Sequence, residues 1–598
     1  MPYKRINDYG VIGDTHSAAL VAADGSIDWA CFPRFDSASV FAAILDDQIG
    51  GRFRLAPAAH YHSDQSYLGD TNILVTRFVT DFGVSEVTDF MPCYEQANGH
   101  IAAFHEIHRV VRCLEGRVDM EVFFQPRFDY ARVTPEMRSH STGVSASGNG
   151  EYLALASPWP LAIDGDAAHS RLSLEPGREA WFVLRYGQKA PLPAHLYRGK
   201  DKLARTVSYW QKQAERCVCH GPWRRMVVRS YLALRLLEYS PTGAMLAAAT
   251  TSLPEEVGGV RNWDYRYTWL RDASFSLDAF LGLGHTDEAA RFMGWLTRVC
   301  VPCGIKSRIM FGIDVGADLR EVELTHLEGY KGSRPVRIGN AAQHQLQLDV
   351  FGEILNTAYI WAGEGGRISR RVWSLLAQFA DAVCENWRYP DQGIWEVRAG
   401  PYHFVYSKFV CWVALNRAAK LARLLGRHPK PRWQQCAEEI REEVLRRGWS
   451  PRKRSFVQHY DTEALDASSL LMPIFGFLPA NDHRMTATIE RTVEELSFGG
   501  FLRRYNSDET NDGVTGSEGA FNLCTFWLIR CLAKLGRLEE ARDHFQRMLG
   551  YANHLGLFSE MTDPTTGDML GNFPQAFTHR AVILTALELG GQIREECV

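Results

Sequence analysis

The chain has 598 residues and a formal net charge of −4, from 66 Lys and Arg against 70 Asp and Glu. Nucleic-acid-binding and membrane-surface proteins carry an excess of basic residues, so this balance argues against both classes. No apolar run in the sequence reaches the roughly 18 residues of a membrane span. Acidic residues interrupt the apolar stretch at the N-terminus, where a secretory signal would be unbroken. We therefore expect a cytoplasmic protein of about two to four domains.

The first third of the chain has the pattern of antiparallel β structure. Short apolar runs, several of them alternating with polar residues, occur at 72–80, 110–114, 118–124 and 180–185. Gly, Asp, Asn and Pro separate these runs, as is typical of a β-sandwich. The pattern predicts a β-sandwich domain over residues 1–198 and a helical linker over residues 199–222.

Residues 223–598 have helical periodicity, with apolar residues recurring every three or four positions. Helices are predicted near 223–240, 265–283, 285–299, 341–362, 369–388, 403–425, 430–447, 463–472, 482–495, 517–535, 538–553 and 575–590. No strand pattern alternates with them, which argues against a βαβ fold. The fold class is therefore predicted as α+β multidomain, with an N-terminal antiparallel β-sandwich followed by an (α/α)6 barrel of six helical hairpins.

The connections that lead into every second predicted helix are long and rich in Trp, Arg, Asp and Glu. In an up-and-down toroid, alternate loops lie at the same end. Function usually lies on loops that a rigid scaffold holds, so we expect an active site at this mouth of the barrel. Aromatic and charged side chains together suit a sugar, which has apolar C–H faces surrounded by hydroxyls.

The first long loop, RNWDYRYTWLRD at 261–272, offers Tyr265, Trp269, Arg271 and Asp272. An Arg–Asp pair can hydrogen-bond to adjacent hydroxyls of one sugar ring, while an aromatic side chain covers its face. The alternative is an ion pair that caps a helix, with the aromatics in the core. Composition alone leaves both possibilities open.

Carboxylates recur in the other long loops. Glu396 directly follows Trp395, and burial beside an indole would raise the pKa of this carboxyl and suit it to donate a proton. Further candidates in these loops are Arg334, Arg504, Asp508, Glu518 and Glu560. Several carboxylates at an aromatic mouth meet the requirement of glycoside hydrolysis, which needs one acid and one base or nucleophile. The sequence has no nucleophile elbow, zinc-protease motif or dinucleotide-binding motif.

The long loops also carry a family resemblance. The motifs are RNWDYRYTWLRD, GYKGSRPVRIGNAAQHQLQLDVFGE, GIWEVRAGPYHFVYSK, EGAFNLCTFWL and GLFSEMTDPTTGDMLGNFPQAF. Together they resemble glycoside hydrolase family 15, and in particular its bacterial and archaeal branch, which includes glucoamylases, glucodextranases and trehalases. The N-terminal DGSIDWACFPRFDSASVFAAILD also resembles that branch, so the resemblance covers nearly the whole chain.

The resemblance implies a sandwich-plus-barrel fold and an inverting mechanism. By position in the motifs, Glu396 matches the family's general acid and Glu560 its general base. If that alignment were wrong, Glu518 would be the substitute base. The resemblance further implies a substrate-binding set of Tyr265, Trp269, Arg271, Asp272, Arg334, Trp395, Arg504, Asp508 and Glu518.

The main expectation is an inverting, exo-acting α-glucoside hydrolase of glucoamylase type that releases β-D-glucose from the non-reducing ends of short α-glucans. The alternative is an α,α-trehalase, and weaker alternatives are a disaccharide phosphorylase and a non-catalytic sugar-binding module. Val397 replaces a second carboxylate of the fungal relatives, so the leaving-group subsite is left unassigned. We expect no metal and no cofactor, because two carboxylates supply the acid–base chemistry. The expected partner is a small α-linked glucose oligosaccharide or disaccharide, with no nucleic acid and no membrane.

Overall fold

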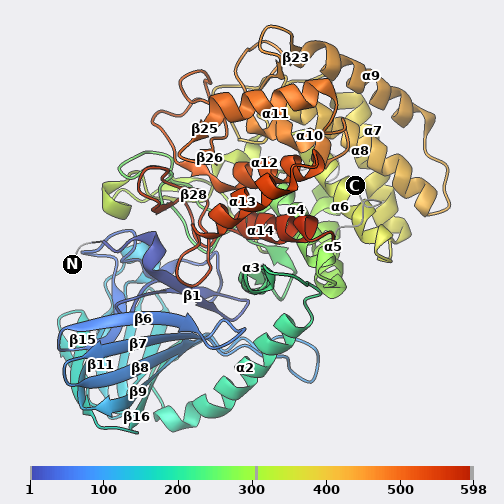
Figure 1. The fold of residues 1–598 in the computed structure, drawn as a ribbon. Helices are drawn as coiled ribbons and strands as arrows, with labels where there is room; N and C mark the ends of the chain where they lie inside the picture. Colours follow the sequence, from blue (N-terminus) through green and yellow to red (C-terminus); the bar gives the residue numbers. More distant parts are fainter. Residues whose placement is uncertain (1–2, 304–307, 315, 593–598) are drawn as a thin grey trace.

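A computed structural model describes residues 3–303, 308–314 and 316–592. Its N-terminal part is a β-sandwich of two antiparallel sheets, as the sequence predicted, and the rest of the described chain is mainly helical (Figure 1). The linker helix α2 (Gly199–Glu215) runs between them. No helix in the described ranges has both the length and the apolar character that crossing a membrane requires.

Each sheet has eight strands among the described residues. The first contains β1 (Tyr9–Gly13), β2 (Ala18–Ala22), β3 (Ser26–Cys31), β4 (Ser39–Phe41), β5 (Arg52–Pro57), β10 (Val118–Gln125), β14 (Ala162–Asp164) and β15 (Ala167–Leu174). The second contains β6 (Tyr61–Tyr67), β7 (Leu74–Thr80), β8 (Gly83–Phe90), β9 (Glu106–Gly116), β11 (Glu136–His140), β12 (Gly143–Gly148), β13 (Glu151–Ala156) and β16 (Glu179–Tyr186). In β10, every second side chain is buried, because successive residues of a strand point to opposite faces.

The helical part forms a closed ring surrounded by further helices. The inner members are α4 (Leu270–Gly282), α6 (Asp349–Gly363), α8 (Val405–Leu424), α10 (Leu471–Ile474), α12 (Asn522–Lys534) and α14 (Ala576–Leu589). Each of these helices contacts the next one in this order, and α14 contacts α4. The contact between α8 and α10 is made through the short helix η5 (Ala467–Leu470), which precedes α10. The outer members are α3 (Arg224–Leu237), α5 (Thr286–Cys303), α7 (Arg370–Asn386), α9 (Pro431–Arg447), α11 (His483–Leu496) and α13 (Leu538–Leu549).

Burial explains which helices lie inside. Helix α14 is buried on nearly all sides, and even its polar residues Thr578, His579 and Arg580 are buried. Helix α9 buries only Trp433, Ile440 and Val444, one stripe of an otherwise charged helix. All twelve predicted helices have a counterpart, but several inner ones begin later than predicted. The most shortened is the predicted 463–472, which is η5 followed by one turn of α10.

The difference has a physical reason. Apolar and aromatic residues precede the inner helices, and their spacing resembles that of a helix. In the structure these residues form loops and short strands. The two-residue strands pair as β17 (Glu238–Tyr239) with β18 (Ala244–Met245), β19 (Thr268–Trp269) with β20 (Met310–Phe311), β21 (Val322–Glu323) with β22 (Arg337–Ile338), β23 (Trp449–Ser450) with β24 (Ser455–Phe456), β25 (Ser497–Phe498) with β26 (Phe501–Leu502), and β27 (Ala520–Phe521) with β28 (Met561–Thr562), which also pairs with β29 (Met569–Leu570).

The sandwich contacts the loops that precede the inner helices. Arg266, which is fully buried, donates hydrogen bonds to the Ser37 carbonyl at 2.8 Å and to the Tyr130 hydroxyl at 2.9 Å, both in the sandwich. Its third partner is Asp264, at 2.6 Å. Trp29 of β3 donates to the Ala249 carbonyl at 2.9 Å. The loop 261–272 is therefore held by the sandwich as well as by its own helix.

Candidate active site

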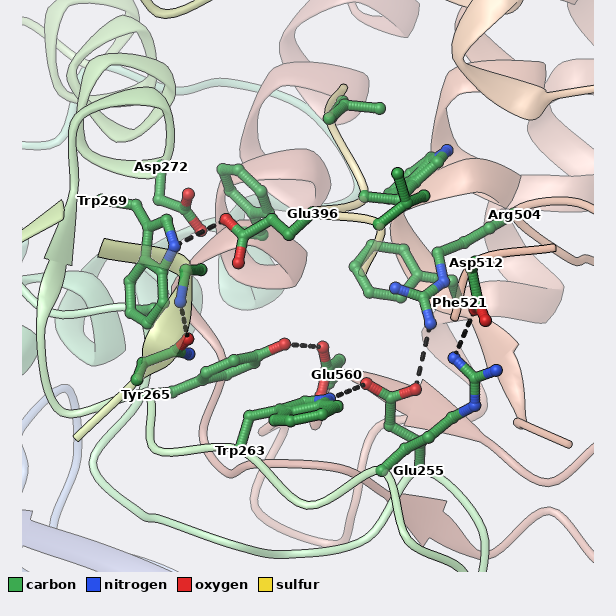
Figure 2. Close-up of a pocket in the computed structure, with 18 of the residues that line it drawn as sticks. Glu255, Trp263, Tyr265, Trp269, Asp272, Glu396, Arg504, Asp512, Phe521 and Glu560 are labelled. Carbon is green, nitrogen blue, oxygen red and sulfur yellow. Dashed lines mark hydrogen bonds and ion pairs between the residues drawn. The ribbon is translucent and has the colours of Figure 1, made fainter. Parts of the chain in front are cut away.

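A pocket opens where the long loops meet, at the N-terminal ends of inner helices such as α4 and α14. Most of the candidates from the sequence line it together: Tyr265, Trp269, Arg271, Asp272, Trp395, Glu396, Arg504 and Glu560. Figure 2 shows Glu396 and Glu560 reaching from opposite sides into one opening.

Glu396 is held at its backbone and at its carboxylate. Its φ of +58° is unusual for a residue with a Cβ, and such strain persists only where surrounding contacts enforce it. Oε1 accepts hydrogen bonds from Nε1 of Trp269 at 2.7 Å and from Nη2 of Arg271 at 3.2 Å. The side chain remains 20% exposed. One carboxylate oxygen is thus fixed, while the group keeps access to the pocket.

Glu560 is more deeply buried, with 1% of the residue exposed. Oε1 accepts a hydrogen bond from the Tyr265 hydroxyl at 2.7 Å, whereas buried Oε2 has no hydrogen-bond partner within the described structure. Gly571 makes room for this carboxylate, because a Cβ built there would lie 2.4 Å from Oε2. Burial, and then the neighbouring Glu255, raise the pKa of Glu560 to about 8. A carboxyl with that pKa is a stronger base than an exposed one.

Arg271 and Asp272 lie in the first turn of α4, where a helix N-terminus favours an acidic side chain. Arg271 donates to Oε1 of Gln347 at 2.9 Å and lies 3.5 Å from Oδ2 of Asp349. Asp272 is 7% exposed and its buried Oδ2 has no hydrogen-bond partner in the described residues. Burial raises the pKa of Asp272 to about 7, although Arg271 opposes the shift. An unsatisfied oxygen in a pocket is suited to accept a sugar hydroxyl.

Arg504 joins two carboxylates at the other side of the pocket. It donates through Nε to Glu518 at 3.0 Å and through Nη2 to Glu255 at 3.0 Å. Glu518 does not line the pocket, and its side chain is 4% exposed. This geometry indicates that Glu518 positions Arg504. It argues against Glu518 as the general base in place of Glu560.

Trp395 lines the pocket and contacts Asp466 and Arg504 there. Its Nε1 donates to both carboxylate oxygens of Asp466, at 3.0 and 2.9 Å, and the Arg504 guanidinium lies 5.4 Å above its ring. The contacts of the Glu396 carboxylate come from Trp269 and Arg271 instead. Three carboxyls that line the pocket have pKa values raised by burial: Asp272, Glu255 and Glu560.

Three predicted substrate-binding residues, Arg334, Asp508 and Glu518, do not line the pocket. Arg334 is exposed, and its Nε donates to the Glu328 carbonyl at 3.4 Å. Asp508 is also exposed, and neither residue lines the pocket. The structure does not bring Arg334 or Asp508 to the pocket, because a loop motif gives the neighbourhood of a side chain but not the direction in which it points.

Sequence reasoning missed Glu255 and Asp512, which line the pocket. Glu255 is 1% exposed, and its Oε1 accepts from Nε1 of Trp263 at 3.1 Å. Burial raises the pKa of Glu255 to about 7, against the opposing effect of Arg504. Glu255 lies upstream of the aromatic motif, beside a second Glu, where nothing in the sequence separates it from a surface residue. Asp512 lies in a loop with three other acidic residues, and no local pattern distinguishes it.

The fold and the site agree with the comparisons to known proteins. The sequence model of glycosyl hydrolases family 15 matches residues 221–587, and one described as trehalase-like, N-terminal, matches residues 3–210. The chain belongs to glycosyl hydrolases family 15 and is a glycoside hydrolase.

Its relatives include proteins named trehalase. One from Thermoplasma volcanium is 39% identical, over 98% of this chain and 94% of its own length. One from Mycolicibacterium smegmatis is 39% identical, over 97% of this chain and 91% of its own length. The crystal structure of a bacterial glucoamylase complexed with acarbose is similar over 99% of this chain and 94% of that chain, with a TM-score of 0.74 and 14% identity. At that identity the similarity shows the fold alone.

Proposed function

We propose that this enzyme is an α,α-trehalase, which hydrolyses trehalose to two molecules of glucose. Glycoside hydrolysis requires two carboxyls at one pocket, and the presence of Glu396 and Glu560 in the same pocket carries this proposal. The relatives named trehalase match nearly the full chain and support trehalose as substrate. They favour the alternative that we considered over our main expectation, a glucoamylase-type enzyme acting on short α-glucans.

We also infer that the helical ring is an (α/α)6 barrel, as predicted. The inference is supported by the cycle of contacts from α4 through α6, α8, α10, α12 and α14 back to α4, with an outer helix before each of these. In such a barrel the loops before the inner helices share one end, which is where the pocket lies. A cytoplasmic location stays a prediction from the sequence.

In the proposed mechanism, Glu396 is the general acid and Glu560 the general base. Glu396 gives its proton to the glycosidic oxygen as the bond to the anomeric carbon breaks. Glu560 takes a proton from a water molecule, whose oxygen attacks that carbon from the opposite face. The attacked ring therefore becomes β-glucose, and the leaving ring keeps its α configuration. The hydrogen bond from Tyr265 holds Oε1 of Glu560, which leaves Oε2 to receive the proton from water.

Substrate contacts in this proposal divide along the pocket. Arg271 and Asp272, at the start of α4, hold the hydroxyls of the ring that is attacked, and Trp269 supports both the acid and that ring. Interactions with parts of the substrate that do not react can be used to orient and distort the ring at the reacting carbon. A phosphorylase would use phosphate in place of the base and its water, so Glu560 with its dedicated Tyr265 and Gly571 favours hydrolysis.

Time-resolved proton NMR of trehalose hydrolysis tests the proposal. We expect α- and β-glucose in equal initial amounts without added phosphate. Release of α-glucose alone would contradict inversion, and glucose 1-phosphate formed only with phosphate would establish a phosphorylase. Maltose should be tested in parallel. Rapid cleavage of maltose with no cleavage of trehalose would support a glucoamylase-type enzyme instead.

A further inference from the structure

Three of the loops around the pocket are fastened together at Asp512. Its Oδ2 accepts hydrogen bonds from Nη1 of Arg261 at 2.7 Å and from the Tyr505 hydroxyl at 2.6 Å. Its main-chain carbonyl accepts from the backbone N–H groups of Arg398 at 2.6 Å and Ala399 at 3.2 Å. Asp512 and Arg261 are only 6% and 4% exposed. Figure 2 shows Asp512 on the Arg504 side of the pocket.

The contact between two of these loops leaves no room for a side chain at Gly513. A Cβ built on Gly513 would lie 2.3 Å from the Ala399 nitrogen and 2.5 Å from the Arg398 carbonyl carbon, which are immobile backbone atoms. The φ of Gly513 is +79°, a conformation that glycine adopts without cost. We refer to Arg261, Arg398, Asp512 and Gly513 as the loop clasp.

The loop clasp lies next to the general acid in sequence and in space. Val397 and Arg398 directly follow Glu396, and both line the pocket together with Val514 from the opposing loop. The Arg398 guanidinium lies 4.2 Å above the ring of Trp263 and forms an ion pair with Glu321 at 2.8 Å. These contacts hold Arg398 in the pocket wall. In the proposed mechanism Glu396 protonates the oxygen that joins the two rings, so we place the leaving ring beside Val397 and Arg398.

We propose that the loop clasp limits the substrate to a disaccharide, because it closes the pocket beyond the leaving ring. A sugar attached to the leaving ring would have to pass between the loops that Asp512 and Gly513 hold in contact. The inference rests on the proposed function for the identity of the bond that is cleaved. It goes beyond that function by assigning the exclusion of longer glucans to particular residues, where Val397 alone leaves the subsite undefined.

The test compares Gly513→Ala with Gly516→Ala. Gly516 also has a positive φ, +88°, but a Cβ there would meet only Oε2 of Glu256, at 3.7 Å. Both variants therefore carry the same kind of backbone strain, and only Gly513→Ala forces the loops apart. The substrates are trehalose and a trisaccharide in which one ring of trehalose carries a further α-1,4-linked glucose. Cleavage of the trehalose bond releases maltose whichever ring is attacked, so the anomers are read by time-resolved proton NMR: α-maltose released with β-glucose reports an extended leaving group.

We expect wild type to cleave trehalose at least about 100-fold better than the trisaccharide, as judged by kcat/KM. Gly513→Ala should raise the ratio of trisaccharide to trehalose cleavage about tenfold, while Gly516→Ala should leave the ratio unchanged. Comparable wild-type activity on the two substrates would overturn the proposal. An unchanged ratio in folded Gly513→Ala, verified by thermal unfolding, would do the same.

Two further measurements keep the test decisive. If Gly513→Ala does not fold, Asp512→Ala is judged by the same ratio, because it removes the contacts to Arg261 and Tyr505. If wild type cleaves maltose but leaves trehalose intact, the proposed function has failed. The loop clasp is then judged with maltose and maltotriose, whose leaving groups differ by the same single glucose.

Discussion

The hydroxyl of Tyr265 lies 2.7 Å from Oε1 of Glu560 and donates a hydrogen bond to it. This bond favours the ionised carboxylate and lowers the pKa of Glu560, against the larger effect of burial. Tyr265→Phe should therefore raise that pKa further and move the acid limb of the pH profile of kcat/KM to higher pH. We expect roughly tenfold less activity at pH 6 and a smaller loss at pH 8.5. A uniform loss at every pH would mean that Tyr265 acts only by packing.

Glu255→Gln should move the same acid limb in the opposite direction. The negative charge of Glu255 raises the pKa of Glu560, and its removal leaves Arg504 to favour the ionised base. The pH profile of kcat/KM should extend to lower pH as a result. Glu518→Gln is the matched control, because Glu518 also pairs with Arg504 but does not line the pocket. If the control shifts the limb as far as Glu255→Gln does, the effect belongs to Arg504.

Glu396→Gln and Glu560→Gln should each reduce kcat on trehalose by roughly 10²–10⁴-fold, the usual contribution of general acid or base catalysis. The controls are Arg334→Ala and Asp508→Ala, two exposed residues outside the pocket, which should stay within about twofold of wild type. Near-normal turnover in Glu560→Gln, together with inactive Glu518→Gln, would move the base to Glu518.

Asp272→Ala should lower kcat as well as raise KM. Asp272 lines the pocket, its buried Oδ2 has no hydrogen-bond partner among the described residues, and binding energy from hydroxyl contacts is used to orient the reacting ring. We expect a loss in kcat of roughly 10²-fold, measured by steady-state kinetics. A rise in KM alone would show that Asp272 binds ground state and transition state equally.

Glu560→Gln should also alter stability in a pH-dependent way. The folded-state pKa of Glu560 is raised from its ordinary value to about 8, so the folded protein prefers the protonated carboxyl. Wild type therefore loses stability as pH rises from 5 to 7, and the variant lacks this loss. The difference in free energy of unfolding, variant minus wild type, should grow by about 2 kcal/mol over that interval. Denaturant unfolding at both pH values measures it, and a constant difference would show that the carboxyl titrates normally.

The parts of the structure that follow from local periodicity could be predicted from the sequence. Alternation in the strands and the spacing of apolar residues in the helices located the sandwich, the linker helix and every helix of the ring. The loops before the inner helices were misread as helix because residues such as Tyr267 and Trp269 are as apolar as core positions.

The site could be predicted only where a motif fixes both a residue and its direction. Glu560 and the Arg271–Asp272 pair adjoin a short strand or a helix N-terminus, whereas Glu396 lies in a turn and is held by Trp269 and Arg271. Arg334 and Asp508 lie in irregular segments and turn to solvent. Arg504, which is far along the chain, and Trp263, which lies in the neighbouring loop, hold the carboxylate of Glu255 at the pocket. That arrangement exists only after folding.

Because the buried Arg266 joins the sandwich to the helical part, the two parts of this enzyme should not be separated. Its guanidinium hydrogen-bonds to Ser37 and Tyr130 across the boundary, and the loop that it anchors also carries Tyr265 and Trp269. Cutting the chain at the linker would leave a buried cation without two of its acceptors and remove the support of Tyr265 and Trp269, which hydrogen-bond to Glu560 and Glu396. A ring of helices produced alone would therefore be a poor minimal enzyme. The sandwich should be inherited, exchanged or engineered together with the loop it supports, and any graft between homologues should keep these contacts as one unit.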